Sequence, residues 1–215
     1  MMSEAQTNPG HTAERLAQIL QDGGVVALAT DTFYCLAACA TNERAVRRIF
    51  TMKNRPVTTP VPLLIADPDD VMKYADELTD TQQRTVTALG QRFWPGALSI
   101  VLKRSPIVPD IVSAGGGTVA LRIPNSPLVR EVVRLLGAPV TGTSANRSGE
   151  NPATTAAAVR DAFRNAVDAV ADGGTTPGGP SSTILALTSA APRILRAGAI
   201  SQAEISEAIH AIRLN

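Results

Sequence analysis

Hydrophobic and polar residues follow two patterns along this chain, one typical of buried strands and the other of amphipathic helices. Short apolar runs bounded by turn residues predict strands over residues 25–28, 62–66, 98–102, 119–123, 140–143, 169–171, 183–187 and 193–196. Apolar residues spaced three and four apart predict helices over residues 12–21, 42–52, 69–75, 80–93 and 126–136, with two more starting at Thr154 and Ser201. Because strands and helices alternate, the pattern indicates an α/β fold.

Start and stop signals support several of these helices. Thr12 is placed to cap the first helix, and Asp80 is predicted to cap the helix that ends at Trp94-Pro95-Gly96. The segment from Ser201 to Glu204 has the spacing of a capping box. We therefore expect the last segment, residues 201–215, to be a helix packed on the same domain as the rest.

Two of the predicted strands end in polar side chains. The strand over residues 25–28 is followed by three hydroxyls and a carboxylate, from Thr30, Asp31, Thr32 and Tyr34. The strand over residues 140–143 is followed by Thr143, Ser144 and Asn146. Because ligands of α/β proteins collect at strand ends, one shared site is a better explanation than two coincidences.

Two cations follow the helix over residues 42–52, in the sequence Lys53-Asn-Arg55-Pro. Beside a hydroxyl-rich strand end they could hold the phosphates of a ligand. The alternative is that they are surface residues that complement the helix dipole. Residues 57–60 come next and could form a loop that closes over a ligand. Residues 115–117 are three glycines, which could form an anion-binding nest or simply a flexible hairpin end.

The composition removes several classes of protein. Fifteen prolines and sixteen glycines are spread over 215 residues without a linker-like concentration, which favours one domain. Aromatic residues make up 3% and the net charge is +1, which argues against a stacking platform for single-stranded nucleic acid. Cys35 and Cys39 lie far in the sequence from the two histidines, His11 and His210, so a zinc site is not expected. No apolar run approaches the length of a membrane helix, and we expect a cytoplasmic protein.

Several short motifs, in a fixed order from about Thr12 to Ile200, resemble those of the Sua5/YrdC/YciO family. They are ATDTFYCL at 29–36, KNRP at 53–56, FWPGALS at 93–99, TVALRIP at 118–124, TSANRSG at 143–149, Ser182-Thr183 and Arg196-Ala-Gly198. The combination of Lys53-Asn-Arg55 with Ser144-Ala-Asn146 resembles the threonylcarbamoyl-AMP synthase branch of that family. The resemblance implies a YrdC-like domain over residues 12–200, with a twisted open mixed sheet, flanking helices and a ligand site on a concave basic face.

The resemblance also implies a reaction and its partners. Threonylcarbamoyl-AMP is made from L-threonine, bicarbonate and ATP, with Mg²⁺ accompanying the nucleotide and with release of pyrophosphate. Separate partner proteins would then transfer the threonylcarbamoyl group to an adenosine beside the tRNA anticodon. The chemistry requires positioning and fixed positive charge rather than a protein nucleophile, which agrees with the absence of a catalytic-triad pattern.

Roles for individual residues follow from the matching motifs. Lys53 and Arg55 would be catalytic and hold the phosphates, while ATP would also contact Thr59, Thr118, Ser144, Asn146, Thr154 and Arg196. Threonine would be bound by Thr32, Arg122, Ser144 and Ser182, with its carboxylate on Arg122. No protein ligand set for a metal is implied. The chain departs from the family pattern at Ala29, Cys35, Leu64 and Ala97; we expect Cys35 to have an ordinary φ and to pack beside the ligand site.

Two other functions remain open at this stage. A carbamoyl-adenylate-dependent transferase would use the same fold with carbamoyl phosphate in place of bicarbonate and threonine. An RNA-binding module without synthase activity would bind tRNA or double-stranded RNA weakly through a basic face. The residues expected to line that face are Arg44, Arg47, Arg48, Lys53, Arg55 and Arg147.

Overall fold

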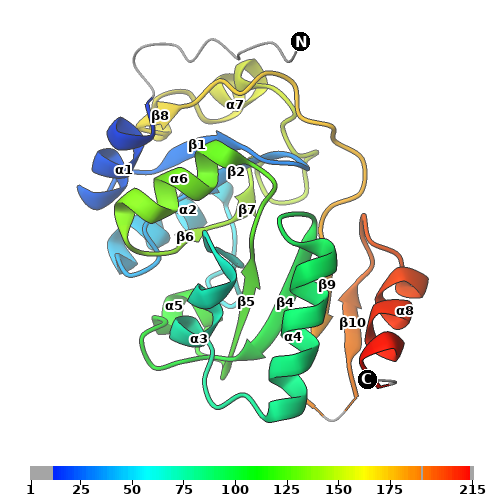
Figure 1. Ribbon diagram of the computed structural model, residues 1–215. Helices are drawn as coiled ribbons and strands as arrows, with labels where there is room; N and C mark the ends of the chain where they lie inside the picture. Colours follow the sequence, from blue (N-terminus) through cyan, green and yellow to red (C-terminus); the bar gives the residue numbers. More distant parts are fainter. Residues whose placement is uncertain (1–11, 190, 214–215) are drawn as a thin grey trace.

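The computed structural model describes residues 12–189 and 191–213, and its helices and strands alternate as predicted (Figure 1). The helices are α1 (Ala13–Gln21), α2 (Glu43–Lys53), α3 (Val71–Tyr74), α4 (Asp80–Phe93), α5 (Asp110–Ser113), α6 (Pro127–Leu136), α7 (Ala156–Phe163) and α8 (Gln202–Arg213). The strands are β1 (Val26–Ala29), β2 (Tyr34–Ala37), β3 (Leu63–Leu64), β4 (Leu98–Lys103), β5 (Thr118–Arg122), β6 (Val140–Thr141), β7 (Thr143–Ser144), β8 (Ala169–Val170), β9 (Thr183–Ala186) and β10 (Arg193–Arg196). Short 3₁₀ turns occupy Pro68–Asp70 and Arg164–Ala166.

The strands form two mixed sheets in place of the single sheet expected from the sequence. One has four strands in the order β7-β2-β1-β8, and the other has six in the order β10-β9-β4-β5-β3-β6. Both contain parallel and antiparallel pairs, so the predicted mixed α/β class is confirmed. The predicted strand over residues 140–143 is divided, since β6 pairs with β3 in the larger sheet and β7 pairs with β2 in the smaller one.

Both faces of β1 are buried, which explains its continuous apolar sequence. Val26 and Leu28 belong to a cluster that includes residues of α1 and α6. The alternate residues Val25 and Ala27 belong to another cluster, which includes residues of α2 and α7. Since successive side chains of a strand point to opposite faces, helices on both sides require an apolar residue at every position.

The larger sheet packs against α4 and α8, which lie beside each other in Figure 1. A third cluster joins residues of β4 and β5 to Leu89 of α4 and to Ile205 and Ala208 of α8. Arg92 and Glu207 form an ion pair of 2.6 Å between the two helices, close to the solvent. The C-terminal helix therefore shares the hydrophobic core of the larger sheet.

Local details correct some expectations. The cap of α4 is Thr79, whose side chain accepts from the Gln82 amide at 3.2 Å, rather than Asp80. The helix predicted over residues 69–75 begins as a 3₁₀ turn and is α-helical only from Val71 to Tyr74. Strand β2 was not predicted, because the polar residues before it indicate a strand end. Helix α5 was not predicted either, and it is only four residues long. His11 and the last two residues lie outside the described ranges.

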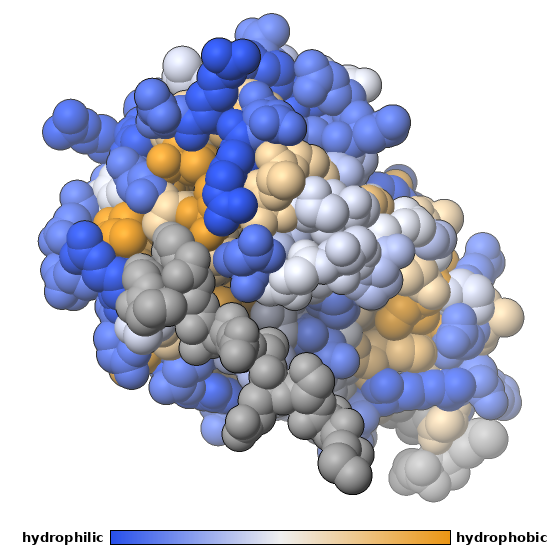
Figure 2. Space-filling view, turned by 90° about the horizontal axis from the view of Figure 1, so that it is seen from above, coloured by the Kyte–Doolittle hydropathy of each residue, from blue (hydrophilic) through white to orange (hydrophobic). Residues whose placement is uncertain are grey.

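The surface above the smaller sheet is mainly hydrophilic. Figure 2, seen from above, shows hydrophilic side chains over most of this face, with smaller hydrophobic patches between them. None of the described helices has the length and apolar character needed to cross a membrane.

Candidate functional site

A cavity lies between the two sheets and is lined by residues from distant parts of the chain. The smaller sheet contributes the end of β1 together with β2 and β7, and the larger sheet contributes β3, β5, β9 and β10. Six of the predicted site residues line this cavity: Thr32, Arg55, Arg122, Ser144, Ser182 and Arg196. The two polar strand ends identified in the sequence thus meet at one site.

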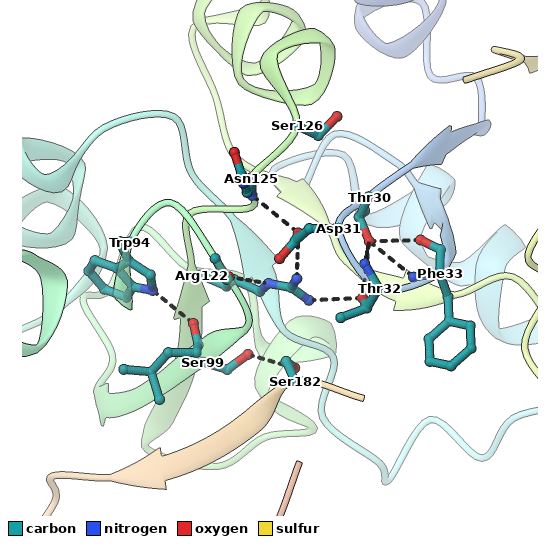
Figure 3. Close-up of polar contacts among 12 residues, drawn as sticks. Thr30, Asp31, Thr32, Phe33, Trp94, Ser99, Arg122, Asn125, Ser126 and Ser182 are labelled. Atoms are coloured by element: carbon teal, nitrogen blue, oxygen red, sulfur yellow. Dashed lines mark hydrogen bonds and ion pairs between the residues drawn. The ribbon is translucent and has the colours of Figure 1, made fainter. Parts of the chain in front are cut away.

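Thr30 shapes the hairpin that connects β1 to β2. Its hydroxyl donates to the Phe33 carbonyl at 2.7 Å and accepts from the backbone amides of Thr32 and Phe33. A threonine that hydrogen-bonds its own turn is a common reason for hydroxyl residues at such positions. Figure 3 shows Thr32 held by this turn on the side that faces Arg122.

Arg122, at the end of β5, is the buried cation of the cavity. Its Nε donates to the Gly96 carbonyl at 2.9 Å, its Nη2 donates to Asp31 Oδ1 at 2.7 Å, and its Nη1 lies 3.5 Å from Thr32 Oγ1 (Figure 3). Burial lowers the pKa of Arg122, and the Asp31 carboxylate opposes that shift. Because a guanidinium has five N–H donors, donors remain for a carboxylate in the cavity.

Arg196, on β10, reaches the cavity beside Ser182. Its guanidinium donates twice to the Ser182 carbonyl and once to the Ser182 hydroxyl, at 3.0 Å from Nη2 to Oγ. The backbone after β10 passes very close to this segment, since a Cβ at Gly198 would lie 2.2 Å from the Ser181 carbonyl oxygen. This close approach explains why a glycine follows Arg196 at a distance of two residues.

Arg55 lines the opposite part of the cavity, next to the loop over residues 57–60. Its Nη2 donates to the Pro60 carbonyl at 2.8 Å, which ties the guanidinium to that loop. The buried Nε of Arg55 has no hydrogen-bond partner within the described parts of the chain. A buried donor without a partner costs about 1–3 kcal/mol, so Arg55 keeps one hydrogen bond unmade in this arrangement.

Lys53 differs from the expectation of a cation that faces the ligand. Its side chain is only 2% exposed, and its ammonium donates to the carbonyls of Ser144 and Asn146 and to Asn146 Oδ1. Burial lowers the pKa of Lys53 to about 8, with the neighbouring Arg55 as a second cause. Lys53 and Asn146 lie beside the cavity but do not line it, unlike Arg55 and Ser144.

One wall of the cavity is less polar and contains two departures from the family pattern. Cys35 and Leu64 both line it, and Leu64 leaves no room for a Cβ at Gly142, which would lie 2.7 Å from the leucine side chain. Cys35 has no positive φ and belongs to a hydrophobic cluster, as expected. Burial raises the pKa of its thiol to about 12, so the sulfur is not a nucleophile at neutral pH.

Besides Lys53 and Asn146, three further predicted ATP-contacting residues do not line the cavity: Thr59, Thr118 and Thr154. Thr59 and Thr118 are exposed, and Thr118 begins the strand that Arg122 ends. The carbonyl of Thr154, just before α7, accepts from the Thr176 amide at 2.9 Å, so its backbone is used in a contact between two distant segments. Contact of these three threonines with ATP therefore stays a prediction that the cavity lining does not support.

The arginines expected to form one basic face are divided between different parts of the surface. Arg44 and Arg48 line a separate cleft near Gly23, and Arg48 forms a 2.9 Å ion pair with Asp168. Arg47 forms an ion pair of 3.7 Å with Glu43 along α2. Of the six predicted arginine and lysine positions, only Arg55 lines the cavity between the sheets.

Asp31 makes contacts at the site that the sequence did not reveal. Besides Arg122, its Oδ1 accepts from the Asn125 amide at 3.1 Å, so it joins the ends of β1 and β5 (Figure 3). The available signal was a carboxylate next to Thr32 and a single arginine in an otherwise apolar strand. A buried arginine requires a counter-charge, but the sequence offers nineteen carboxylates from which to choose.

Comparison with known proteins gives consistent results. The family model described as Sua5_yciO_yrdC, Telomere recombination, matches residues 18–198. The threonylcarbamoyl-AMP synthase of Pyrococcus abyssi is 36% identical over 199 residues, covering 93% of this chain and 57% of the relative. The threonylcarbamoyl-AMP synthase of Bacillus subtilis is 36% identical over 216 residues, covering 99% of this chain and 60% of the relative.

A solved structure supports the same relationship. The crystal structure of P. abyssi Sua5 complexed with L-threonine superimposes with a TM-score of 0.87 at 35% identity, covering 92% of this chain and 57% of that one. The chain thus spans somewhat less than two thirds of the length of these relatives.

Proposed function

Because the chain belongs to the Sua5/YciO/YrdC family, we propose that it synthesises threonylcarbamoyl-AMP from L-threonine, bicarbonate and ATP, as a nucleotidyltransferase that releases pyrophosphate. The observation that carries the proposal is the placement of Arg122, Arg55 and Arg196 around one cavity. A site for two anionic substrates needs separated cations, and these three arginines come from β5, β10 and the loop after α2.

Arg122 is the proposed partner of the threonine carboxylate. It is buried, its position is fixed by Gly96 and Asp31, and it keeps donors free on the side of Thr32. A guanidinium held in this way can bind a carboxylate through two parallel hydrogen bonds. The similar structure of P. abyssi Sua5 complexed with L-threonine supports threonine as the amino acid bound.

Arg55 and Arg196 are the proposed partners of the ATP phosphates. Arg55 lines the cavity beside the loop over residues 57–60, and Arg196 lines it from β10 of the larger sheet. Burial lowers the pKa of each guanidinium, but an arginine remains charged throughout the neutral range. Both would stabilise charge that grows on the phosphate oxygens during transfer.

The reaction has two balanced steps. The amine of threonine and bicarbonate form N-carboxy-threonine and release water. A carboxylate oxygen of that carbamate then attacks the α-phosphorus of ATP, the bond to the β-phosphate oxygen breaks, and pyrophosphate leaves. In our proposal Arg122 and Thr32 orient the amino acid, and Ser144 and Ser182 supply hydroxyls between the two substrates.

Magnesium is proposed to enter with the nucleotide. The described residues contain no group of three or more His, Cys, Asp or Glu side chains that could hold a metal ion, and the cavity lining contributes hydroxyl oxygens instead. Mg²⁺ is commonly bound by substrate phosphates and water with few protein ligands, so this donor set is compatible with it. When bound, the ion would neutralise phosphate charge, and the Ser144 hydroxyl, which lines the cavity, would be a candidate protein ligand.

The context of the reaction is also a proposal. The product would be consumed by separate proteins that transfer the threonylcarbamoyl group to tRNA, in the cytoplasm. Weak binding of tRNA or double-stranded RNA remains part of the proposal, although the arginines that were expected to form one basic face are divided.

The test is pyrophosphate release from ATP measured with and without L-threonine and bicarbonate. We expect release to require both, and mass spectrometry to detect threonylcarbamoyl-AMP. ATP turnover that is indifferent to threonine would contradict the proposal. Turnover supported by carbamoyl phosphate in place of threonine and bicarbonate would identify a carbamoyl-adenylate-dependent enzyme instead.

A further inference from the structure

Two motifs of the site each contain one residue that lines the cavity and one that does not. In Lys53-Asn-Arg55 the lining residue is Arg55, and in Ser144-Ala-Asn146 it is Ser144. We propose that Lys53 and Asn146 are positioning residues that build the loop over residues 144–150, while Arg55 and Ser144 contact the ligand. This inference rests on the proposed function only for the identity of that ligand, a nucleoside triphosphate. It assigns Lys53 a role different from the phosphate contact expected from the motif.

The hydrogen bonds of Lys53 carry the first part of the argument. Its Nζ donates to the Ser144 carbonyl, to the Asn146 carbonyl at 2.7 Å and to Asn146 Oδ1 at 3.2 Å. An ammonium has three donors, and all three are therefore used inside the protein. The carbonyl of Lys53 also accepts from the Ser148 amide at 2.8 Å, so both its side chain and its backbone hold the loop.

The amide of Asn146 is equally occupied. Its Oδ1 accepts from Lys53 Nζ and, at 2.6 Å, from the Ser144 hydroxyl. Its Nδ2 donates at 2.8 Å to the carbonyls of Arg147 and Glu150. Because an ammonium can only donate, the atom facing Lys53 must be the oxygen, which fixes the orientation of the amide. Asn146 thus has no donor left for a nucleotide.

Ser144 and Arg55 are the residues of the two motifs that are left to contact the ligand. Since the Ser144 hydroxyl donates its proton to Asn146, it presents only lone pairs to the cavity and can accept from a ligand N–H or O–H. Arg55 is the complementary case, because it lines the cavity and a guanidinium can only donate. One motif pair therefore supplies one donor and one acceptor to the ligand, held in place by the other two residues.

The buried charge of Lys53 is consistent with a positioning role. Arg55 and Cys35 are the titratable groups that act on it, and burial is the largest cause of the lowered pKa. Three oxygen acceptors offset the cost of desolvating an ammonium. If a phosphate were the main partner of Lys53, we would expect at least one donor of its ammonium to be unused before ATP binds. Instead, all three donors are used by Ser144 and Asn146.

Hydrogen–deuterium exchange tests the inference without any measurement of activity. In Lys53→Met, we expect amides over residues 144–150 to exchange at least tenfold faster than in the wild type, because two carbonyls and one side chain lose their donor. Lys73→Met is the matched control, since Lys73 is an exposed lysine paired with Asp70 and should leave the loop unchanged. Unchanged exchange in Lys53→Met would overturn the proposal.

A double-mutant cycle gives the kinetic test. Lys53→Met and Asn146→Ala should each lower kcat/KM for ATP, and the double variant should be within about threefold of the worse single variant, because both act through one loop. Lys53→Met combined with Arg196→Ala should instead multiply the two losses. Multiplying losses for Lys53 and Asn146 would show independent ligand contacts and contradict the proposal.

The experiments distinguish a failure of the positioning role from a failure of the proposed reaction. If Lys53→Met fails to fold, Asn146→Ala, a change at a partly exposed residue, still tests the loop by exchange at residues 147–150. If exchange changes as expected but threonine and bicarbonate do not support pyrophosphate release, the positioning role stands and the proposed reaction fails. The reverse result, turnover with an undisturbed loop, retains the reaction and rejects the positioning role.

Discussion

Replacing Asp31 by asparagine is expected to make the protein less stable but to make it bind L-threonine more tightly. Asp31 and Arg122 form a 2.7 Å ion pair in which the side chains are 16% and 8% exposed. Removing one partner of such a pair leaves the other charge without compensation in a poorly solvated place. Asparagine keeps an oxygen that can accept from Arg122 and from the Asn125 amide, so the geometry is retained while the charge is removed.

The two effects can be compared in size. Loss of one partner of a buried pair costs about 3 kcal/mol of unfolding free energy. In the wild type, the Asp31 carboxylate repels a carboxylate bound on the other edge of Arg122; at about 6 Å and an effective dielectric constant of about 20, that repulsion is about 3 kcal/mol. Weaker anchoring of Arg122 opposes the gain by about 1 kcal/mol, because the bonds to Gly96 and Thr32 remain. The net gain of about 2 kcal/mol corresponds to threonine binding that is tighter by about twenty- to thirtyfold.

Urea unfolding and calorimetric titration with L-threonine measure the two quantities. Asp67→Asn is the control, since Asp67 pairs with Arg134 at 2.8 Å near the surface, with a side chain that is 42% exposed, and its loss should cost less than about 1 kcal/mol. The unfolding temperature of Asp31→Asn should rise more on adding threonine than that of the wild type. An Asp31→Asn variant as stable as the wild type, or one with weaker threonine binding, would refute this reasoning.

Four other predictions follow from the same contacts. Arg55→Ala should lower the rate of pyrophosphate release at saturating substrates by about two to three orders of magnitude, and unchanged turnover would make Arg55 an ordinary surface charge. Gly198→Ala should lower the unfolding free energy by about 3 kcal/mol in urea, because the new Cβ would lie 2.2 Å from the Ser181 carbonyl; a smaller cost would mean that the backbone moves easily. The Cys35 thiol, whose pKa burial raises to about 12, should be alkylated at pH 8 only after unfolding, and mass spectrometry that finds it labelled in the native protein would contradict its burial. Burial lowers the pKa of Lys53 to about 8, so between pH 8 and about pH 10.5 the unfolded chain holds this proton and the folded chain does not. The unfolding free energy of the wild type, relative to that of Lys53→Met, should therefore rise over this pH range. A difference in unfolding free energy that falls over the same range would disprove the lowered pKa.

Residues close together in the sequence carried most of the information that could be predicted. The apolar spacing of α1, α2, α4 and α6 depends on a helix face, which is a local property, and these helices lie where the pattern placed them. The polar ends of β1 and β7 were also visible, and they do meet at one cavity. The ordered motifs identified the family because each motif is a short segment whose residues act together.

Only the tertiary structure decided which of those polar groups face a ligand. Lys53 and Arg55 are two residues apart, yet Lys53 has all its donors used by the loop over residues 144–150, whereas Arg55 lines the cavity. Asp31 was one of many carboxylates until β1 and β5 brought it to Arg122. The division of the strands into two sheets could not be predicted for the same reason. Strand partners and counter-charges depend on contacts between segments far apart in the chain, and a local sequence pattern does not indicate which distant segment will supply them.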